Sequence, residues 1–410
     1  MRATASPRAR ARAPLPDTRV VLDVGSRVIK AGICGEPSPR VVVDAADAAS
    51  AILGRRVDSL WELDMMHVSA SADAKQKFVE LVRVLNRILR GIWQDHLLVD
   101  PPAARVLCVH SPLLIDTVQD AICEVVLHRL EAAAVSFIDS HTLALVAAGR
   151  STGLVVDVGY LETCVMPVYG GRPIERAMRT TPRGGRRLVQ CLRTLLAAQG
   201  DGAAVDMTLA NSLASMALLV GPPVESGERS AAPFDPDAFA RRYSTSSVAD
   251  MHYGDGDRVV PGWIRERAAE VLFEPGDEDE ASIVECVVQS LKDIPMDARR
   301  EILESVVLAG GTATIPGFAR RVQQDLERAL HAWQVGRGIS SRTGSPFSGS
   351  NAFSYVHVLN APRSDDAPLP MASLPSSLLA WIGGSIAGSL GSDGTLQITR
   401  EQWLAAARVP

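Results

Sequence analysis

VVLAGGTATIPGFARR, the stretch from Val306 to Arg321, is an apolar run that stops at two glycines, Gly310 and Gly311. A glycine pair at the end of a buried strand has two interpretations. It is a tight turn, because glycine reaches positive φ without penalty, or it is a place where bare backbone amides approach a phosphate. The stretch alone favours the turn, so the choice depends on the rest of the chain.

Two other segments of the sequence repeat one pattern. VVLDVG at residues 20–25 is echoed by LVVDVG at residues 154–159, and each leads into a second apolar strand. An internal repeat of this kind indicates two domains of similar plan, each opening with a strand–Asp-Val-Gly–strand hairpin. Strands that alternate with helices around both hairpins predict an α/β layer architecture.

Hydrophobic periodicity places further elements along the chain. It predicts helices at 73–97, 116–130, 283–291 and 298–304, and strands at 105–110 and 135–139. Residues 1–18 are rich in arginine and poor in apolar side chains, so we expect a disordered N-terminal tail.

Composition excludes several classes of protein. The chain has 410 residues, 47% of them hydrophobic, and a net charge of −5. No strong basic field argues for nucleic acid as a partner, and no uninterrupted apolar run approaches the ~20 residues that insertion into a membrane needs. The six cysteines are scattered, which favours a reducing compartment over a zinc site or a disulfide framework.

The two hairpins and the glycine pair together favour a nucleotide site. A turn of Gly and Ser exposes consecutive amides that form an anion nest. An aspartate at a strand end can hold Mg²⁺ through water, since Mg²⁺ keeps several waters when it binds phosphates. Two facing hairpins can therefore clamp a triphosphate, with the glycine pair beside the nucleoside.

These segments resemble the actin family. DVGSRVIKAGICGEPSPR and GLVVDVGYLETCVMPVYGG are similar to its two phosphate loops, DARREILESVVLAGGTATIPGFARR to its adenosine segment, and AWIGGSIAGSL at 380–390 to a helix near its C-terminus. The resemblance implies an α/β, actin-like two-domain fold with duplicated βββαβα-type domains around a nucleotide cleft. It implies a small domain at 19–148 plus 361–410 (subdomain 1 and a reduced subdomain 2), and a large domain at 149–360 (subdomains 3 and 4).

The resemblance also assigns the site residues. The cofactor, ATP or ADP with Mg²⁺, is expected at Asp23, Gly25, Ser26 and Lys30 of the first loop, Asp157 and Gly159 of the second, and Gly310, Gly311 and Thr312 of the nucleoside loop. The resemblance places the metal near Asp23 and Asp157, held through water.

Several positions depart from the family pattern. Arg27 stands at the second glycine of the first loop, and Tyr160 with Leu161 replaces an Asp-Gly pair in the second. Cys164 replaces a histidine and Ser140 a glutamine, both of which position water in the family. Because small misplacements of a reacting group lower the rate steeply, the resemblance implies a pseudo-ATPase with no catalytic residue and weak or absent hydrolysis.

Ala214 and Ser215 make a further departure, because the family presents a Lys-Glu pair to the base there. Two elements of the family's filament contacts are also missing. The chain lacks the family's DNase-binding loop, and an acidic segment follows Leu272-Phe273 where the family has an apolar loop. We therefore expect a chain that does not polymerise by itself.

Among actin-related proteins, the sequence looks most similar to the one at the pointed end of dynactin. This implies a cytoplasmic, cytoskeletal protein that caps a centractin-type filament, binds the dynactin pointed-end subunits and supports dynein-driven transport. LWELDMMHV at 60–68 concentrates apolar side chains, and Trp61 with Met65 is the candidate partner site. Packing of these residues under their own subdomain is the equally weighted alternative.

Two other functions stay open. One is a chromatin-remodelling actin-related protein, for which the RARAR segment at 8–12 is the single candidate nuclear signal. The other is an active enzyme, either an actin-type ATPase or a sugar kinase of the same superfold, because a fold alone does not settle function.

Overall fold

The computed structural model describes residues 18–61, 72–199, 205–221, 248–253, 258–274, 279–336, 356–361, 374–391 and 397–406. The tail at 1–18 lies outside this part of the chain except for its last residue. None of the helices described combines the length and the apolar character that crossing a membrane requires.

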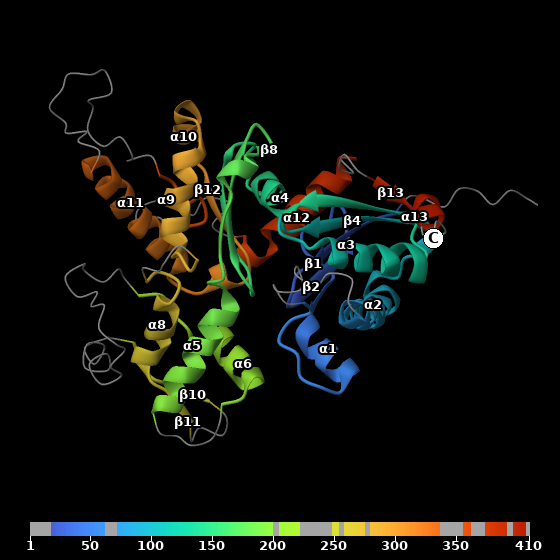
Figure 1. Ribbon diagram of the computed structural model, residues 1–410, viewed down its shortest axis with the longest axis horizontal. Coiled ribbons are helices and arrows are strands. Elements are labelled where there is room, and N and C mark those ends of the chain that lie inside the picture. The colour runs from blue at the N-terminus through green and yellow to red at the C-terminus, as the bar shows by residue number, and fades with distance from the viewer. Residues whose placement is uncertain are drawn as a thin grey trace, which may run out of the picture.

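The first half of the molecule is built on a six-stranded sheet (Figure 1). Its order is β13 (Gln397–Thr399), β5 (Ala134–Asp139), β4 (Ala104–His110), β1 (Thr18–Val24), β2 (Val28–Ile33) and β3 (Val41–Asp44). The strands β1, β4 and β5 are parallel neighbours, whereas β1, β2 and β3 form an antiparallel meander. The predicted hairpin of β1 and β2 is therefore an interior part of a larger mixed sheet, with β4 on one side and β3 on the other.

Helices cover this sheet because their apolar residues recur at helical spacing. They are α1 (Ala45–Leu53), α2 (Ala72–Ile92), α3 (Asp116–Cys123), α4 (Ser140–Ala147), α12 (Leu379–Ser389) and α13 (Arg400–Ala406). In α2 the buried face comprises Leu81, Leu85, Ile88 and Ile92, which recur every three or four residues. The side chain of Asp44 caps α1 by accepting the amide of Asp47.

The second half repeats the plan around a smaller sheet. Its order is β12 (Val306–Ala309), β6 (Gly153–Val158), β7 (Thr163–Tyr169) and β8 (Arg172–Pro173), with β9 (Arg179–Thr181) also paired to β7. A separate hairpin joins β10 (Met251–Tyr253) and β11 (Arg258–Val260). The helices are α5 (Gly185–Ala198), α6 (Met207–Ala217), α8 (Gly262–Glu270), α9 (Ile283–Asp293), α10 (Met296–Leu303) and α11 (Phe318–Gly336).

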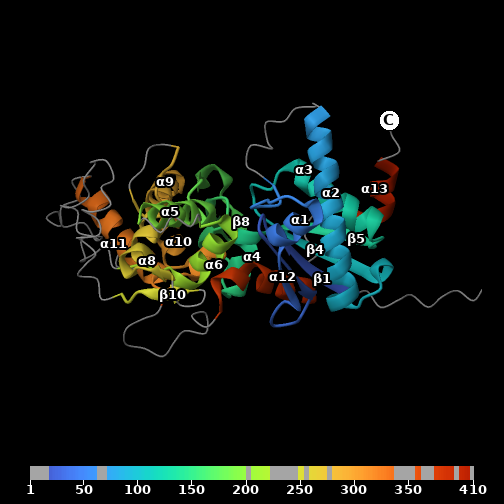
Figure 2. The same cartoon turned by 90° about the horizontal axis from the view of Figure 1, so that it is seen from below.

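Two helices lie between the sheets, as Figures 1 and 2 both show for α4 and α12. Gly383 permits their contact, since a Cβ there would overlap the carbonyl oxygen of Leu143 in α4. Gly384, in turn, packs on Val21 and Val109 of the first sheet. Gly383 and Gly384 are therefore both required by close packing.

The α/β layer architecture that the sequence predicts is confirmed. The predicted strands at 105–110 and 135–139 are β4 and β5, and the predicted helices at 283–291 and 298–304 are α9 and α10. The helix expected at 116–130 is α3 only to Cys123, after which the backbone widens into a π-helical turn over Glu124–Arg129. The predicted domain boundaries stay a prediction.

Candidate functional site

The two hairpin turns, Gly25–Arg27 (the first turn) and Gly159–Leu161 (the second turn), have the same backbone arrangement. In each, the amide of the glycine donates to the carbonyl three residues further on, that of Val28 at 3.0 Å and that of Glu162 at 2.9 Å. A Cβ on either glycine would press on the same acceptor oxygen, at 2.9 and 3.1 Å. The sequence repeat is thus a structural repeat with a steric reason for each glycine.

The glycine pair after β12 combines both interpretations. Gly310 has a φ of 90°, and a Cβ there would overlap the carbonyl oxygen of Val158. Gly311 is exposed, and a Cβ there would have no atom within 4 Å. Gly310 is therefore needed for the turn itself, whereas Gly311 leaves the open space that a ligand-facing position requires.

The third turn, Gly310–Thr312, lies against the second turn. The hydroxyl of Thr312 donates to the carbonyl of Gly159 at 2.9 Å, and the amide of Gly185, at the start of α5, donates to the same carbonyl at 2.9 Å. A Cβ at Gly185 would lie 3.0 Å from the Thr312 hydroxyl. Segments more than 120 residues apart in the sequence therefore meet at one point.

Charged side chains gather beneath these turns. Lys30 and Asp23 are directly opposite on β2 and β1, and Lys30 Nζ lies 2.6 Å from Asp23 Oδ2. Burial raises the pKa of Asp157; the charge of His141 opposes that rise and the carboxylate of Asp23 adds to it. The structure thus brings the two predicted metal-facing aspartates into one electrostatic neighbourhood, although they belong to different sheets.

A further acid, Glu162, belongs to this neighbourhood. Burial raises its pKa to about 7, and the carboxylate of Asp157 contributes to the rise. Nothing in the sequence distinguishes Glu162, because a glutamate after a turn is usually an exposed residue. Its position at the end of the second turn is what makes it unusual.

His141 is the second residue that sequence reasoning missed. It is fully buried at the start of α4, with Nδ1 at 3.5 Å from Asp139 Oδ1 and Nε2 at 3.3 Å from the carbonyl oxygen of Cys164. Burial lowers its pKa, but Cys164 and Asp139 outweigh that effect and leave the pKa well above its usual range. A histidine from α4 thus contacts Cys164, the position at which the sequence departs from the family's histidine.

Arg27 and Tyr160, two of the departures noted in the sequence, contact each other. The guanidinium carbon of Arg27 lies 5.1 Å from the centroid of the Tyr160 ring. Arg27 also donates to Asp44 at 2.8 Å and to the carbonyl of Asp58 at 3.3 Å. Ser26, the remaining predicted residue of the first turn, accepts the amide of Leu60 on its carbonyl at 2.6 Å.

The residues present fit a magnesium nucleotide. Within the residues described, the amides of Ser26, Arg27, Tyr160 and Leu161 make no hydrogen bond, so both turns keep donors for an anion. Lys30, which is paired with Asp23, lies on β2, the strand that follows the first turn. No group of three or more His, Cys, Asp or Glu side chains in that same part of the chain is placed to ligate a metal directly, and a hydrated Mg²⁺ does not need one. The nucleotide and metal assignments stay predictions.

Of the two candidate partner residues, Trp61 and Met65, only Trp61 belongs to the described part of the chain. Trp61 is partly buried and packs against the core of the first half, which favours the alternative that it is a packing residue. Met65 lies outside the described residues. Ala214, on α6, packs against the core of the second half, and Ser215 bonds the carbonyl of Ser212 in its own helix.

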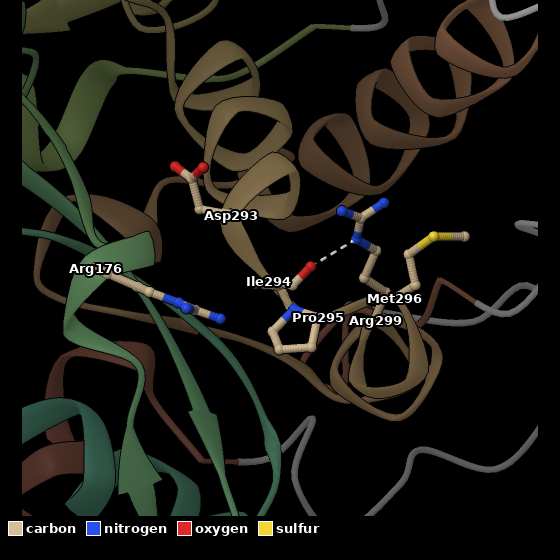
Figure 3. A pocket seen from close by; sticks show the side chains of 6 residues that line it. All are labelled: Arg176, Asp293, Ile294, Pro295, Met296 and Arg299. Carbon is tan, nitrogen blue, oxygen red and sulfur yellow. Dashed lines mark hydrogen bonds between the residues drawn. The ribbon is translucent and has the colours of Figure 1, made fainter.

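A hollow of about 550 Å³ opens elsewhere on the second half (Figure 3). It is lined by Arg176, Asp293, Ile294, Pro295, Met296 and Arg299. The guanidinium of Arg299 is tied to the carbonyl of Ile294 at 2.9 Å. None of the predicted site residues lines it, so it does not belong to the candidate nucleotide site.

Comparison with known proteins places this geometry in context. The sequence model of the family described as "Actin" matches residues 15–216 and 230–405. Actin-related protein 4 of Arabidopsis thaliana is 24% identical, with 94% of this chain and 95% of the relative covered. Actin-related protein 4 of Oryza sativa subsp. indica is 22% identical, with 91% and 93% covered.

These relatives correct one expectation from the sequence. The assignment to the pointed end of dynactin is wrong, and with it the centractin-type filament and the dynactin pointed-end subunits as partners. The misassignment has a physical cause. The quoted segments include β6, β7 and β12, whose side chains are mostly buried. Core positions of one fold share apolar patterns whichever subfamily they belong to.

Proposed function

Because the chain belongs to the actin family, we propose that it is an actin-related protein of the chromatin-associated class, acting as a subunit of a chromatin-bound assembly. The observation that carries this proposal is the match to actin-related protein 4, which covers that protein and this chain almost end to end. Such a match concerns the whole fold and not only the shared nucleotide motifs.

This proposal implies a nuclear location in place of the cytoplasmic one expected with dynactin. The RARAR segment at 8–12 is the basic stretch that import would use. Purification of the tagged full chain from nuclear extract is expected to recover histones and remodelling subunits. Recovery of cytoskeletal proteins alone, with no chromatin component, would contradict the proposal.

We also propose that the three turns hold ATP or ADP with Mg²⁺ as a structural ligand. The actin fold usually binds a nucleotide with a divalent metal. Lys30 and the free amides of the first and second turns would face the phosphates, Asp23 and Asp157 the waters of the metal, and Gly311 with Thr312 the nucleoside. When bound, the magnesium nucleotide would supply charged groups that both halves of the molecule contact.

Hydrolysis is proposed to be weak or absent, because Ser140 and Cys164, which stand where the family positions water, are both buried against His141. Ser140 is buried and its hydroxyl lies 3.2 Å from His141 Nδ1. The other ring nitrogen of His141, Nε2, is within hydrogen-bond distance of the backbone carbonyl of Cys164. The Cys164 residue itself is only 3% exposed. General-base catalysis needs a group within hydrogen-bond reach of the water, and these three are committed to one another.

Two measurements on the purified chain test the nucleotide proposal. Addition of Mg-ATP or Mg-ADP is expected to raise the melting temperature, since a ligand that binds only the folded state stabilises it by mass action. Phosphate release from Mg-ATP is expected to stay at the level of buffer alone. Turnover well above that level would refute the pseudo-ATPase proposal and leave nucleotide binding standing.

A further inference from the structure

The contact between Arg27 and Tyr160 joins the two halves of the molecule. Arg27 belongs to the first turn, between β1 and β2, whereas Tyr160 belongs to the second turn, between β6 and β7. Their separation of 5.1 Å, from guanidinium carbon to ring centroid, is within the range of a cation–π interaction. The pair therefore sits between the two turns whose amides are free.

Arg27 is held in place before it meets the ring. Its guanidinium pairs with Asp44 at 2.8 Å, and its side chain is only 15% exposed. Because these contacts already restrict its rotamers, stacking on Tyr160 costs little further conformational entropy.

Tyr160 is fixed equally well from the other side. Its hydroxyl oxygen is buried, close to Arg27 and to Asn211 of α6. A Cβ at Gly185 would lie 3.1 Å from the edge of the ring, so this glycine makes room for the aromatic side chain. The ring is thus packed by the second half and presents a face to the first.

A second contact across the same junction is weaker. Arg56 lies 3.2 Å from Asp206, the N-cap of α6, and also contacts the Thr208 hydroxyl. The two charged side chains are 41% and 60% exposed, and exposed ion pairs contribute little to stability. Of these two contacts, the one between Arg27 and Tyr160 is therefore better able to hold the first and second turns together.

We propose that Arg27 and Tyr160 form a latch that keeps the two halves closed without a bound nucleotide. In this chain two side chains link the first and second turns, a role that the phosphates of a nucleotide would otherwise have.

The latch is tested on the isolated full chain, stripped of nucleotide and metal. Unnatural amino acids that carry the donor and acceptor dyes replace two exposed residues, Ala51 of α1 and Met216 of α6. These two helices face each other across the junction (Figure 1). Single-molecule energy transfer then gives the ratio of closed to open molecules. Tyr160→Leu and Arg27→Gly are each expected to lower this ratio about tenfold, as loss of a desolvated cation–π contact implies.

Matched variants separate the latch from general damage. Tyr160→Phe keeps the ring and Arg56→Ala removes only the exposed pair, so both are expected to leave the ratio unchanged. The double variant of Arg27→Gly and Tyr160→Leu should be no more open than either single variant. A wild-type ratio in both single variants, or effects that multiply in the double variant, would overturn the proposal.

Folding of the variants is monitored by circular dichroism. If Tyr160→Leu does not fold, Arg27→Gly reports the same contact from the other half. Because no nucleotide and no chromatin partner is present, the outcome is independent of whether the proposed function holds.

Discussion

A side-chain oxygen of Asp157 lies 2.5 Å from the point that a Cβ would occupy at Gly310. Asp157 is the second-last residue of β6, and Gly310 directly follows β12, the neighbouring parallel strand. The predicted metal-facing carboxylate and the glycine pair are therefore packed directly against each other. Substitution at one residue of the pair therefore acts on the other.

Gly310→Ala is expected to destabilise the protein strongly. The new methyl group would overlap the carbonyl of Val158 and crowd Asp157, and the φ of 90° is unfavourable for alanine. We expect the free energy of unfolding to fall by about 2–4 kcal/mol, because backbone strain and overpacking add up. Urea unfolding measures this change. Gly311→Ala is the matched control, because a Cβ there meets no atom. Equal losses for both variants would contradict the packing explanation.

Arg321→Met is expected to unfold the second half more easily. Arg321 is 1% exposed, makes two bonds to Glu270 at 2.7 and 2.9 Å and one to Asp325 at 2.8 Å, and stacks over Phe273. Its removal leaves two buried carboxylates unpaired, which costs about 3–5 kcal/mol.

Thermal melting checks the Arg321 prediction. The control is Arg300→Ala, which removes an ion pair to Glu304 on the surface of α10. That change is expected to cost no more than about 0.5 kcal/mol. A melting temperature for Arg321→Met within a degree or so of wild type would show that the buried network is not needed.

Glu162 is expected to make stability fall as pH rises. Burial and Asp157 raise its pKa from 4.5 to about 7, so between these values the folded protein holds a proton that the unfolded chain has lost. Stability therefore decreases from about pH 4.5 to 7. Glu162→Gln removes this dependence.

The measurement for Glu162 is urea unfolding at pH 5 and pH 8. At pH 8 the free energy of unfolding of Glu162→Gln should be about 1–2 kcal/mol higher than that of wild type, allowing for partial exposure of the carboxylate. At pH 5 the difference should be smaller. Glu175→Gln, at an exposed position, is the control. A difference between Glu162→Gln and wild type that is the same at both pH values would refute the assignment.

Gly383→Ala is expected to loosen the contact between α4 and α12. A methyl group there would overlap the carbonyl of Leu143, so the helices between the two sheets must separate. We expect a lower melting temperature and faster hydrogen exchange in α12. Unchanged exchange in that helix would show that the backbone absorbs the methyl group elsewhere.

The sequence by itself determined the local elements and their repetition. Val20–Gly25 and Leu154–Gly159 end in the same turn because a Cβ at either glycine would press on the acceptor of its own turn, and this requirement is local enough to appear in sequence. The apolar spacing of α2 and the strands around it is equally local. The α/β class and the family resemblance follow from such patterns.

Tertiary structure alone decided which distant side chains meet. Arg27 and Tyr160, 133 positions apart in the chain, appear in sequence as two unrelated departures, and only the approach of the two sheets makes them a contact. His141 and Glu162 have unusual environments for the same reason, since burial and charge come from residues far along the chain. Electrostatic and packing energies depend on distance in space, which sequence spacing does not record.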